Sequence, residues 1–324
     1  MPSPSALAAE GDGPPGGMAA ISARERVQRW AWGSERLREA LVGYAFILVP
    51  MGVFLVFFIF PIGYAVYISR YEWGIFGKID YVGWGNYRTL FHDEIFWRAV
   101  KNTAMFAVAV VALEVTLGLA LAVVVNQTLR FRTFYRAGFY FPSIASSAAI
   151  TAIAIYVLSA DGLFNSFLGL FGYHTNRPWF YDSSTALWSI VGLNSWATSG
   201  TIMLFYLAAL QSISTDVYEA AAIDGARAWR TFWKVTFPLL RPAHFFVLVV
   251  AVIGALQIFD QAFIVAGPEG GPNYSTLTVV LYLYSKAIAN AEFGYAAAVG
   301  VVLFVGIFTI TVIQRLIFGR PEVA

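Results

Sequence analysis

The sequence predicts an all-α integral membrane protein with six transmembrane helices, and three observations lead to that class. Of the 324 residues, 59% are hydrophobic and only 12% are charged, about half the charged fraction of an ordinary soluble domain. Several separate stretches are long and apolar enough to cross a hydrocarbon core of roughly 30 Å as a helix. These stretches are continuous apolar runs, whereas the strands of a membrane barrel alternate between apolar and polar residues.

Six stretches meet the length of about 20 residues that a membrane helix needs. The segment 275–289 is also apolar but has fifteen residues, so we interpret it as an interfacial or half-inserted helix on the outer side. Residues 1–40 begin with a run rich in Ala, Gly and Pro, and we expect a cytoplasmic tail that is partly disordered. Residues 41–324 then form the transmembrane domain. The six predicted spans are 43–69, 104–125, 137–159, 186–210, 243–266 and 295–318.

The distribution of positive charge predicts the orientation. If all six spans cross and the N-terminus is cytoplasmic, two thirds of the 21 Lys and Arg residues fall in segments on the inner side. Loops on the cytoplasmic side of a membrane carry the excess of Lys and Arg. Both termini are therefore predicted to be cytoplasmic.

The composition also excludes several classes of function. A net charge of +2 is too small to attract nucleic acid, and the absence of Cys removes thiolate catalysis and Cys-ligated metals. His92, His174 and His244 are far apart in the sequence, which disfavours a His-rich metal site. The chain lacks a GxxxxGK[ST] loop as well as HExxH and GxSxG motifs. We expect no catalytic residue, no metal and no bound cofactor in this chain.

The loop 211–242, on the predicted inner side, is strongly patterned. Asp216 and Glu219 have the spacing of a capping box, which predicts a helix start at Asp216. Gly225 permits the positive φ that ends a helix, and a second helix follows with Trp229 and Trp233 on one face. The sequence therefore predicts a helix–turn–helix at the membrane surface. The alternative is an ordinary amphipathic connector.

The segment Glu-Ala-Ala-Ala-Ile-Asp-Gly-Ala at 219–226, continuing to Pro238, resembles the EAA motif of binding-protein-dependent ABC importer permeases. Phe237 departs from the Leu that is common in the family before that Pro. Segments 86–103 and 259–276 resemble the carbohydrate-uptake branch, to which the first permease subunit of maltose transporters belongs. The resemblance covers nearly the whole chain after about residue 40, and it implies the type I importer permease fold.

The resemblance also implies partners and a mechanism. The EAA loop is expected to insert into a cleft of an ATPase subunit, so that ATP and Mg²⁺ are bound by two ATPase chains and not by this one. A second homologous permease subunit and an extracytoplasmic solute-binding protein complete the expected importer, in the cell membrane of a prokaryote. The mechanism that it implies is alternating access. The coupling residues are expected to be Glu219, Ala220, Ala221, Asp224, Gly225, Arg227 and Pro238.

Polar residues within the spans are candidates for the substrate pathway. Asn194 and Trp196 offer an amide and an aromatic face that suit a sugar, although the polar residues of this span also suit close helix packing. Asp260, with Phe259 and Gln257 nearby, either lines the pathway or is hydrogen-bonded to a neighbouring helix. Glu114 is expected to pair with a neighbouring helix.

The expected substrate is a sugar or oligosaccharide, because no Arg or Lys lies deep in a span to hold an anion. Glycerol phosphate or another polar solute is the alternative substrate. A secondary carrier that works without ATP is the alternative mechanism.

Overall fold

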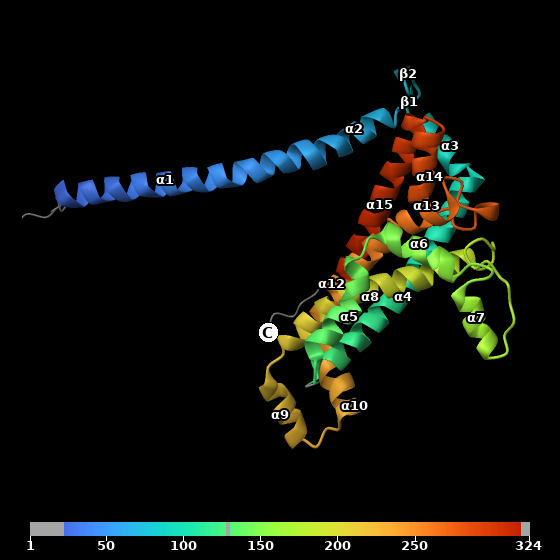
Figure 1. Cartoon of the computed structure of the whole chain (residues 1–324). Coiled ribbons are helices and arrows are strands. Elements are labelled where there is room, and N and C mark those ends of the chain that lie inside the picture. The colour runs from blue at the N-terminus through green and yellow to red at the C-terminus, as the bar shows by residue number, and fades with distance from the viewer. Residues whose placement is uncertain (1–22, 128–129, 319–324) are drawn as a thin grey trace, which may run out of the picture. The chain divides into compact units, whose positions relative to one another are not determined.

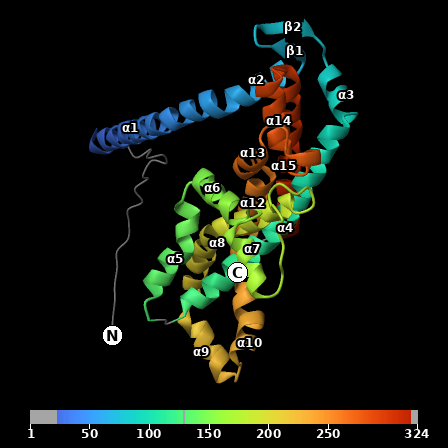
Figure 2. The ribbon, with the colours of Figure 1, turned by 45° about the vertical axis from the view of Figure 1, so that its right-hand side comes forward.

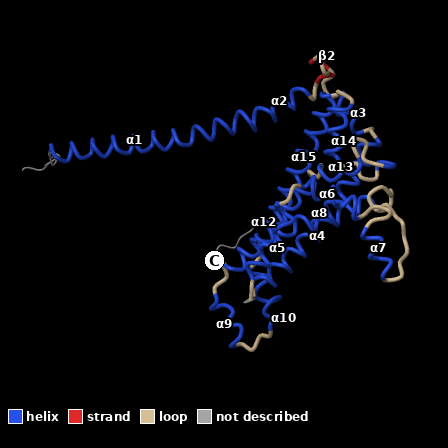
Figure 3. Tube along the Cα trace, in the orientation of Figure 1, coloured by secondary structure: helices blue, strands red, loops and turns tan. Residues whose placement is uncertain are grey.

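The computed structural model describes residues 23–127 and 130–318, with side chains from residue 38 onward, and the described chain is mainly helical (Figures 1 and 3). The chain divides into two units, Met1–Gly63 and Tyr64–Ala324, which are described separately. Most of the predicted tail, residues 1–22, lies outside the described residues.

The first unit consists of helix α1 (Ala23–Phe54), a π-helical turn (Leu55–Ile59) and the beginning of α2 (Phe60–Ile68). The part from Arg38 to Ile68 is long and apolar enough to cross a membrane, which confirms the first predicted span. The large apolar side chains of this part are exposed, as expected for a helix whose solvent is lipid. The basic segment that precedes the span belongs to the same continuous helix.

In the second unit the end of α2 is followed by an antiparallel hairpin, β1 (Tyr71–Gly74) and β2 (Gly77–Tyr81), in which Tyr71 pairs with Tyr81. Figure 2 shows this hairpin at one end of the unit and helices α9 and α10 at the other. The helices of the unit up to the loop 211–242 are α3 (Gly85–Phe91), α4 (Glu94–Asn126), α5 (Arg132–Ile144), α6 (Ser147–Val157), α7 (Leu163–Leu170) and α8 (Ala186–Gln211). After the loop come α12 (Arg241–Leu256), α13 (Asp260–Ala266), a 3₁₀ turn (Pro272–Tyr274), α14 (Val279–Tyr284) with a π-helical extension (Ser285–Ala289), and α15 (Phe293–Phe318).

Helices α4 and α8 form the centre of the second unit, and small residues let them approach closely. A Cβ atom on Gly118 of α4 would lie 2.4 Å from Ile202 Cγ2 of α8. On α8, a Cβ atom on Gly200 would lie 2.4 Å from the carbonyl oxygen of Phe139 in α5. Such small-residue contacts are the usual means by which membrane helices associate.

The third predicted span is not a straight helix, and this prediction is corrected. It is made of α5 and α6, which meet at an angle of 93°. Ala145 and Ser146 take extended conformations at the break. Pro142 supplies no backbone N–H, and Ser143 Oγ donates to the Ala197 carbonyl of α8 at 2.6 Å, so α5 is held against α8 while the chain turns.

The other predicted spans are confirmed as Glu94–Asn126, Ala186–Gln211, Arg241–Ala266 and Phe293–Phe318. The fifth of the six is interrupted at residues 257–259, where α12 ends and α13 begins. The Ile258 carbonyl at this break accepts a hydrogen bond from Thr278 Oγ1 at 3.1 Å. Irregular backbone at membrane depth is tolerated when its polar groups find such partners. The predicted short helix is present as Val279–Ala289.

Candidate functional site

The loop 211–242 begins with helix α9 (Thr215–Ile223), whose cap differs from the prediction. Ser214, in an extended conformation, is the N-cap residue, and its Oγ accepts a hydrogen bond from the Asp216 N–H at 3.3 Å. Ser is among the best N-cap residues. The predicted capping box from Asp216 to Glu219 is therefore wrong, and Asp216 lies in the first turn, where its charge complements the helix dipole.

Gly225 ends α9 as predicted. Its φ is +71°, and its N–H donates to the Ala222 carbonyl at 3.0 Å. The Ala226 N–H donates to the Ala221 carbonyl, also at 3.0 Å. This pair of bonds defines a Schellman motif, in which the left-handed residue reverses the chain. A Cβ atom on Gly225 would meet nothing within 4 Å, so the backbone conformation and not crowding demands glycine here.

The second half of the loop is α10 (Ala228–Thr231), a π-helical turn (Phe232–Thr236) and α11 (Phe237–Leu239). The rings of Trp229 and Trp233 lie 5.7 Å apart, which confirms that they share one face. Thr236 Oγ1 donates to Tyr218 Oη at 3.4 Å and so connects the second half of the loop to α9. The predicted helix–turn–helix is thus present.

The loop presents apolar and charged groups together on its surface. Ile223 is 86% exposed and Trp229 is 74% exposed, which is unusual for large apolar side chains outside a bilayer or an interface. Of the predicted coupling residues only Ala221 is buried. The charged side chains form no ion pair with any residue that the structure describes. The coupling residues exposed on this surface are Glu219, Ala220, Asp224, Gly225, Arg227 and Pro238.

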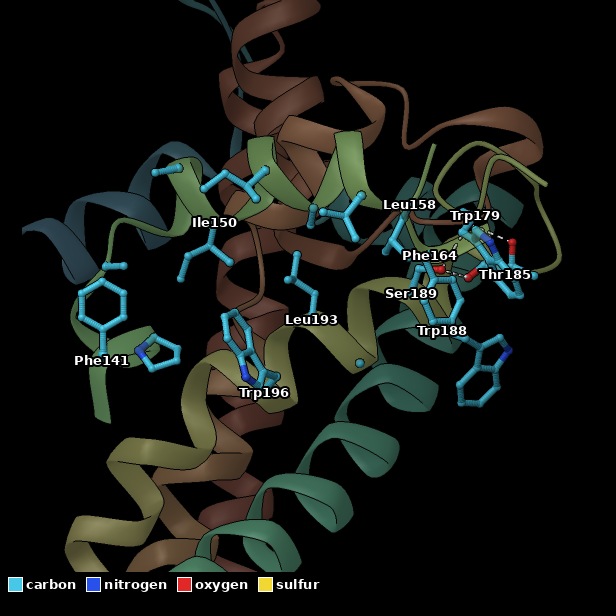
Figure 4. Close-up of a pocket in the computed structure, with 17 residues that line it drawn as sticks. Phe141, Ile150, Leu158, Phe164, Trp179, Thr185, Trp188, Ser189, Leu193 and Trp196 are labelled. Carbon is cyan, nitrogen blue, oxygen red and sulfur yellow. Dashed lines mark hydrogen bonds between the residues drawn. The ribbon is translucent and has the colours of Figure 1, made fainter. Parts of the chain in front are cut away.

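The candidates on α8 lie on different parts of the helix surface. Trp196 is 54% exposed and lines a cavity of about 690 Å³ between α8 and the bent pair α5–α6. In Figure 4, Trp196 and Leu193 lie opposite Ile150 of α6. Asn194 does not line this cavity, and its amide makes no hydrogen bond within the described part of the chain.

The remaining pathway candidates lie at the break in the fifth span. Gln257 and Asp260 are exposed. Phe259 packs against Phe263 and Tyr284, with ring centroids 5.2 and 5.1 Å away. None of the three candidates lines the 690 Å³ cavity, so the structure does not gather the five candidates into one cavity.

Glu114 is paired with a neighbouring helix, as predicted. It is only 4% exposed, and its Oε2 accepts a hydrogen bond from Thr198 Oγ1 of α8 at 2.5 Å. Thr198 Oγ1 also lies 2.8 Å from the Asn194 carbonyl oxygen. This buried polar pair joins α4 to α8 at the centre of the second unit.

Sequence reasoning missed a cluster around Asp93, the N-cap residue of α4. Asp93 Oδ1 accepts the Ile95 N–H at 2.8 Å. Its Oδ2 accepts hydrogen bonds from the hydroxyls of Tyr282 and Tyr295, the latter at 2.8 Å. Burial alone would raise the pKa of Asp93, but these hydrogen bonds hold it below its usual range. The sequence offers only one signal for this cluster, an Asp directly before a helix, because the two tyrosines that bond Asp93 are almost 200 residues away.

The fold is that of a membrane protein with five long apolar helices and one bent pair among the described residues. A family model described as the binding-protein-dependent transport system inner membrane component matches residues 114–322. The chain belongs to this family, as its EAA-like segment predicted. It is a transport permease of the ABC type and a multi-pass membrane protein.

Named relatives cover most of the chain. The probable ABC transporter permease protein YesP of Bacillus subtilis is 34% identical over 278 residues, which is 85% of this chain and 90% of that protein. The multiple sugar-binding transport system permease protein MsmF of Streptococcus mutans is 34% identical over 286 residues, 87% of this chain and 96% of its own. The lactose transport system permease protein LacF of Rhizobium radiobacter is 33% identical over 276 residues, which is 84% of this chain and 92% of that protein.

A solved structure supports the fold. The crystal structure of a bacterial ABC transporter involved in the import of the acidic polysaccharide alginate contains a chain that aligns with a TM-score of 0.78. The alignment covers 89% of this chain and 98% of that one at 23% identity. At this level of identity the likeness establishes the fold alone.

Proposed function

We propose that this chain is one of two permease subunits of an ATP-driven importer and forms half of its translocation pathway. The observation that carries the proposal is the surface of the loop 211–242. There a Schellman turn at Gly225 connects two short helices, and Ile223 and Trp229 are exposed beside charged side chains that form no ion pair within the described part of the chain. Such a protruding surface suits insertion into a cleft of another protein. ATP and Mg²⁺ would then be bound by two separate ATPase subunits.

The orientation follows from the distribution of charge. The loop 211–242 and both termini would face the cytoplasm because most of the basic residues lie on that side. The hairpin β1–β2 is at the opposite end of the second unit from α9 and α10, which supports an external position for the hairpin (Figure 2). The extracytoplasmic solute-binding protein would contact this outer end.

We propose a sugar or oligosaccharide as the substrate. MsmF and LacF are named for sugar transport, and AraP of Bacillus subtilis, 32% identical over 269 residues, is named for arabinooligosaccharides. Basic residues in the described spans lie toward the span ends. An anionic solute would therefore find no cation deep in these spans, which favours a neutral solute. The amide of Asn194, which has no hydrogen-bond partner among the described residues, and the exposed ring of Trp196 suit hydroxyl groups and sugar faces. The break that carries Gln257, Phe259 and Asp260 resembles the discontinuous helices at the binding sites of other transporters.

The proposal is tested by co-expressing the chain with the genes next to its own and purifying the complex in detergent. We expect an ATPase subunit to co-purify, and its ATP hydrolysis to rise when the binding protein is loaded. Uptake of radiolabelled lactose and of an arabino-oligosaccharide, with glycerol phosphate as the third solute, then identifies the substrate class. Uptake without any ATPase partner would favour a secondary carrier and would overturn the proposal.

A further inference from the structure

A series of aromatic side chains leads from the loop 211–242 to helix α8. The Trp233 ring lies 5.7 Å from Trp229 and 5.1 Å from Phe237. The Phe237 ring lies 4.5 Å from the imidazole of His244, and that imidazole lies 5.3 Å from Tyr206. These five residues, from Trp229 to Tyr206, therefore make continuous contact across α10, the π-helical turn, α11, α12 and α8.

His244 is the only member of the series that hydrogen-bonds on both sides. Its Nε2 lies 3.2 Å from the Phe237 carbonyl oxygen, and its Nδ1 lies 2.9 Å from Tyr206 Oη. A carbonyl oxygen only accepts, so Nε2 must carry the proton that is donated to Phe237. In the neutral ring Nδ1 then accepts the proton of the Tyr206 hydroxyl.

The two hydrogen bonds of His244 are the directional interactions within a largely apolar contact between the loop and α8. Tyr206 is completely buried on α8. Tyr206, Phe237 and His244 border a largely apolar cavity of about 1150 Å³ between the loop, α4, α8, α12 and α15. Apolar contacts are non-directional, so they let one element slide past another, whereas a hydrogen bond with both partners held in helices resists such sliding.

We propose that His244 is a positioning residue that ties the end of the loop 211–242 to α8, so that a displacement of the loop moves α8. This inference rests on the proposed function, in which an ATPase subunit displaces that loop. Thr236, bonded to Tyr218 of α9, brings the first helix of the loop into the same connection. The pathway candidate Trp196 is ten residues before Tyr206 on α8, about 15 Å along a continuous helix.

The test uses the complete importer reconstituted in nanodiscs, with the substitution Trp196→Cys as a probe on α8. The chain contains no Cys, so this side chain is its only thiol. The rate of labelling by a fluorescent maleimide is measured with and without ATP plus vanadate. The same measurement is made after Tyr206→Phe, after His244→Leu, after both together and after His244→Gln. ATP hydrolysis is followed in parallel.

We expect ATP plus vanadate to change the labelling rate in the parent protein, which carries Trp196→Cys and no other substitution. The change should shrink about threefold to tenfold in Tyr206→Phe and in His244→Leu, while the ATPase subunits stay bound and hydrolyse ATP. The double variant should lose no more than either single variant, because all three remove the same connection. His244→Gln, which keeps a donor and an acceptor, should largely retain the response.

A matched control is Thr151→Val, which removes a buried hydroxyl from α6 outside the aromatic series. It should leave the nucleotide response unchanged. A full response in both Tyr206→Phe and His244→Leu would overturn the inference, as would a double variant whose losses multiply. If His244→Leu does not fold, Tyr206→Phe decides. The absence of any nucleotide response in the parent, or of a bound ATPase, would instead contradict the proposed function.

Discussion

Gly225 determines the shape of the loop 211–242 through its backbone. Its φ of +71° lies in the left-handed region, which costs roughly 1–2 kcal/mol for a residue with a Cβ atom. The space around it is open, so a small side chain meets no obstacle. Conformation alone therefore accounts for the glycine.

Gly225→Ala is expected to destabilise the end of α9 by about 1 kcal/mol, whereas Gly225→Asn should cost less because Asn tolerates this conformation better. Hydrogen exchange of residues 215–231 in the purified protein measures the effect. The Ala variant should exchange several-fold faster than the wild type, with Asn in between. Equal exchange in all three proteins would contradict the role given to φ.

Asp93 should make stability depend on pH. Its pKa in the folded protein is lower than usual, because burial, which raises it, is outweighed by hydrogen bonds from Tyr282, Tyr295 and two backbone N–H groups. A carboxyl with a lowered folded pKa stabilises fully above its unfolded pKa of about 4, and this stabilisation is lost as the pH falls through the folded value.

We therefore expect Asp93→Asn to unfold at a lower temperature than the wild type at pH 6. The difference should narrow at pH 3, because below an unfolded pKa of about 4 the unfolded wild type binds a proton that folding must release. Thermal unfolding followed by tryptophan fluorescence in detergent gives both midpoints. A difference between the two proteins that stays constant from pH 6 to pH 3 would show that the Asp93 carboxylate does not act in this way.

At the scale of elements, the crossing of α5 over α8 depends on Gly200. A Cβ atom there would approach the Phe139 carbonyl oxygen to 2.4 Å and Tyr140 Cα to 2.9 Å, so backbone would have to move. Gly192 on the same helix has nothing within 4 Å of its Cβ position and provides a matched control.

Gly200→Ala is expected to lower stability by about 1–3 kcal/mol, as overpacking usually does. Gly192→Ala should be neutral or slightly stabilising, because Ala is the better helix former. Melting temperatures of the two purified variants test the crossing. If Gly200→Ala has the same melting temperature as the wild type, α5 and α8 do not approach each other as closely as described.

The elements show which structural information is local. The six apolar runs, the helix end at Gly225 and the pairing of Trp229 with Trp233 were predicted, because each depends on residues close together in sequence. The bend between α5 and α6 was not predicted, because the length and hydrophobicity of the run suggested one straight helix. Its geometry depends on the bond from Ser143 to Ala197 of another helix.

The N-cap residue of α9 was also predicted wrongly. Ser214 and Asp216 both suit an N-cap, but Ser214 has the extended backbone of an N-cap (φ −60°, ψ 140°) and Asp216 is already helical. In the cluster around Asp93 the bond to Tyr295 spans 202 positions, and the bond from His244 to Tyr206 spans 38 positions. Contacts over such separations cannot be predicted from periodicity or spacing along the chain.

At the scale of the whole molecule, the absence of Cys makes the orientation directly measurable. Phe76→Cys places a thiol at the fully exposed tip of the hairpin, and Asp216→Cys places one in the loop 211–242. In intact cells a membrane-impermeant maleimide should label the former and not the latter. After the cells are opened both should react. The reverse pattern would contradict the proposed orientation.

We propose that the loop 211–242 transmits the work of separate ATPase subunits to a sugar pathway in this chain. Glu219 is exposed on α9 and Gly225 closes its end. Reversing the charge of Glu219 or placing Asp at Gly225 therefore alters the contact surface and leaves the membrane helices intact. Glu39→Lys, at another exposed acid, is the matched control.

The most direct test is ATP-dependent uptake of radiolabelled sugar by proteoliposomes that contain the complete importer. We predict that Glu219→Lys and Gly225→Asp abolish uptake, while membrane insertion stays normal and Glu39→Lys transports at the wild-type rate. Uptake at the wild-type rate by either loop variant would contradict the account.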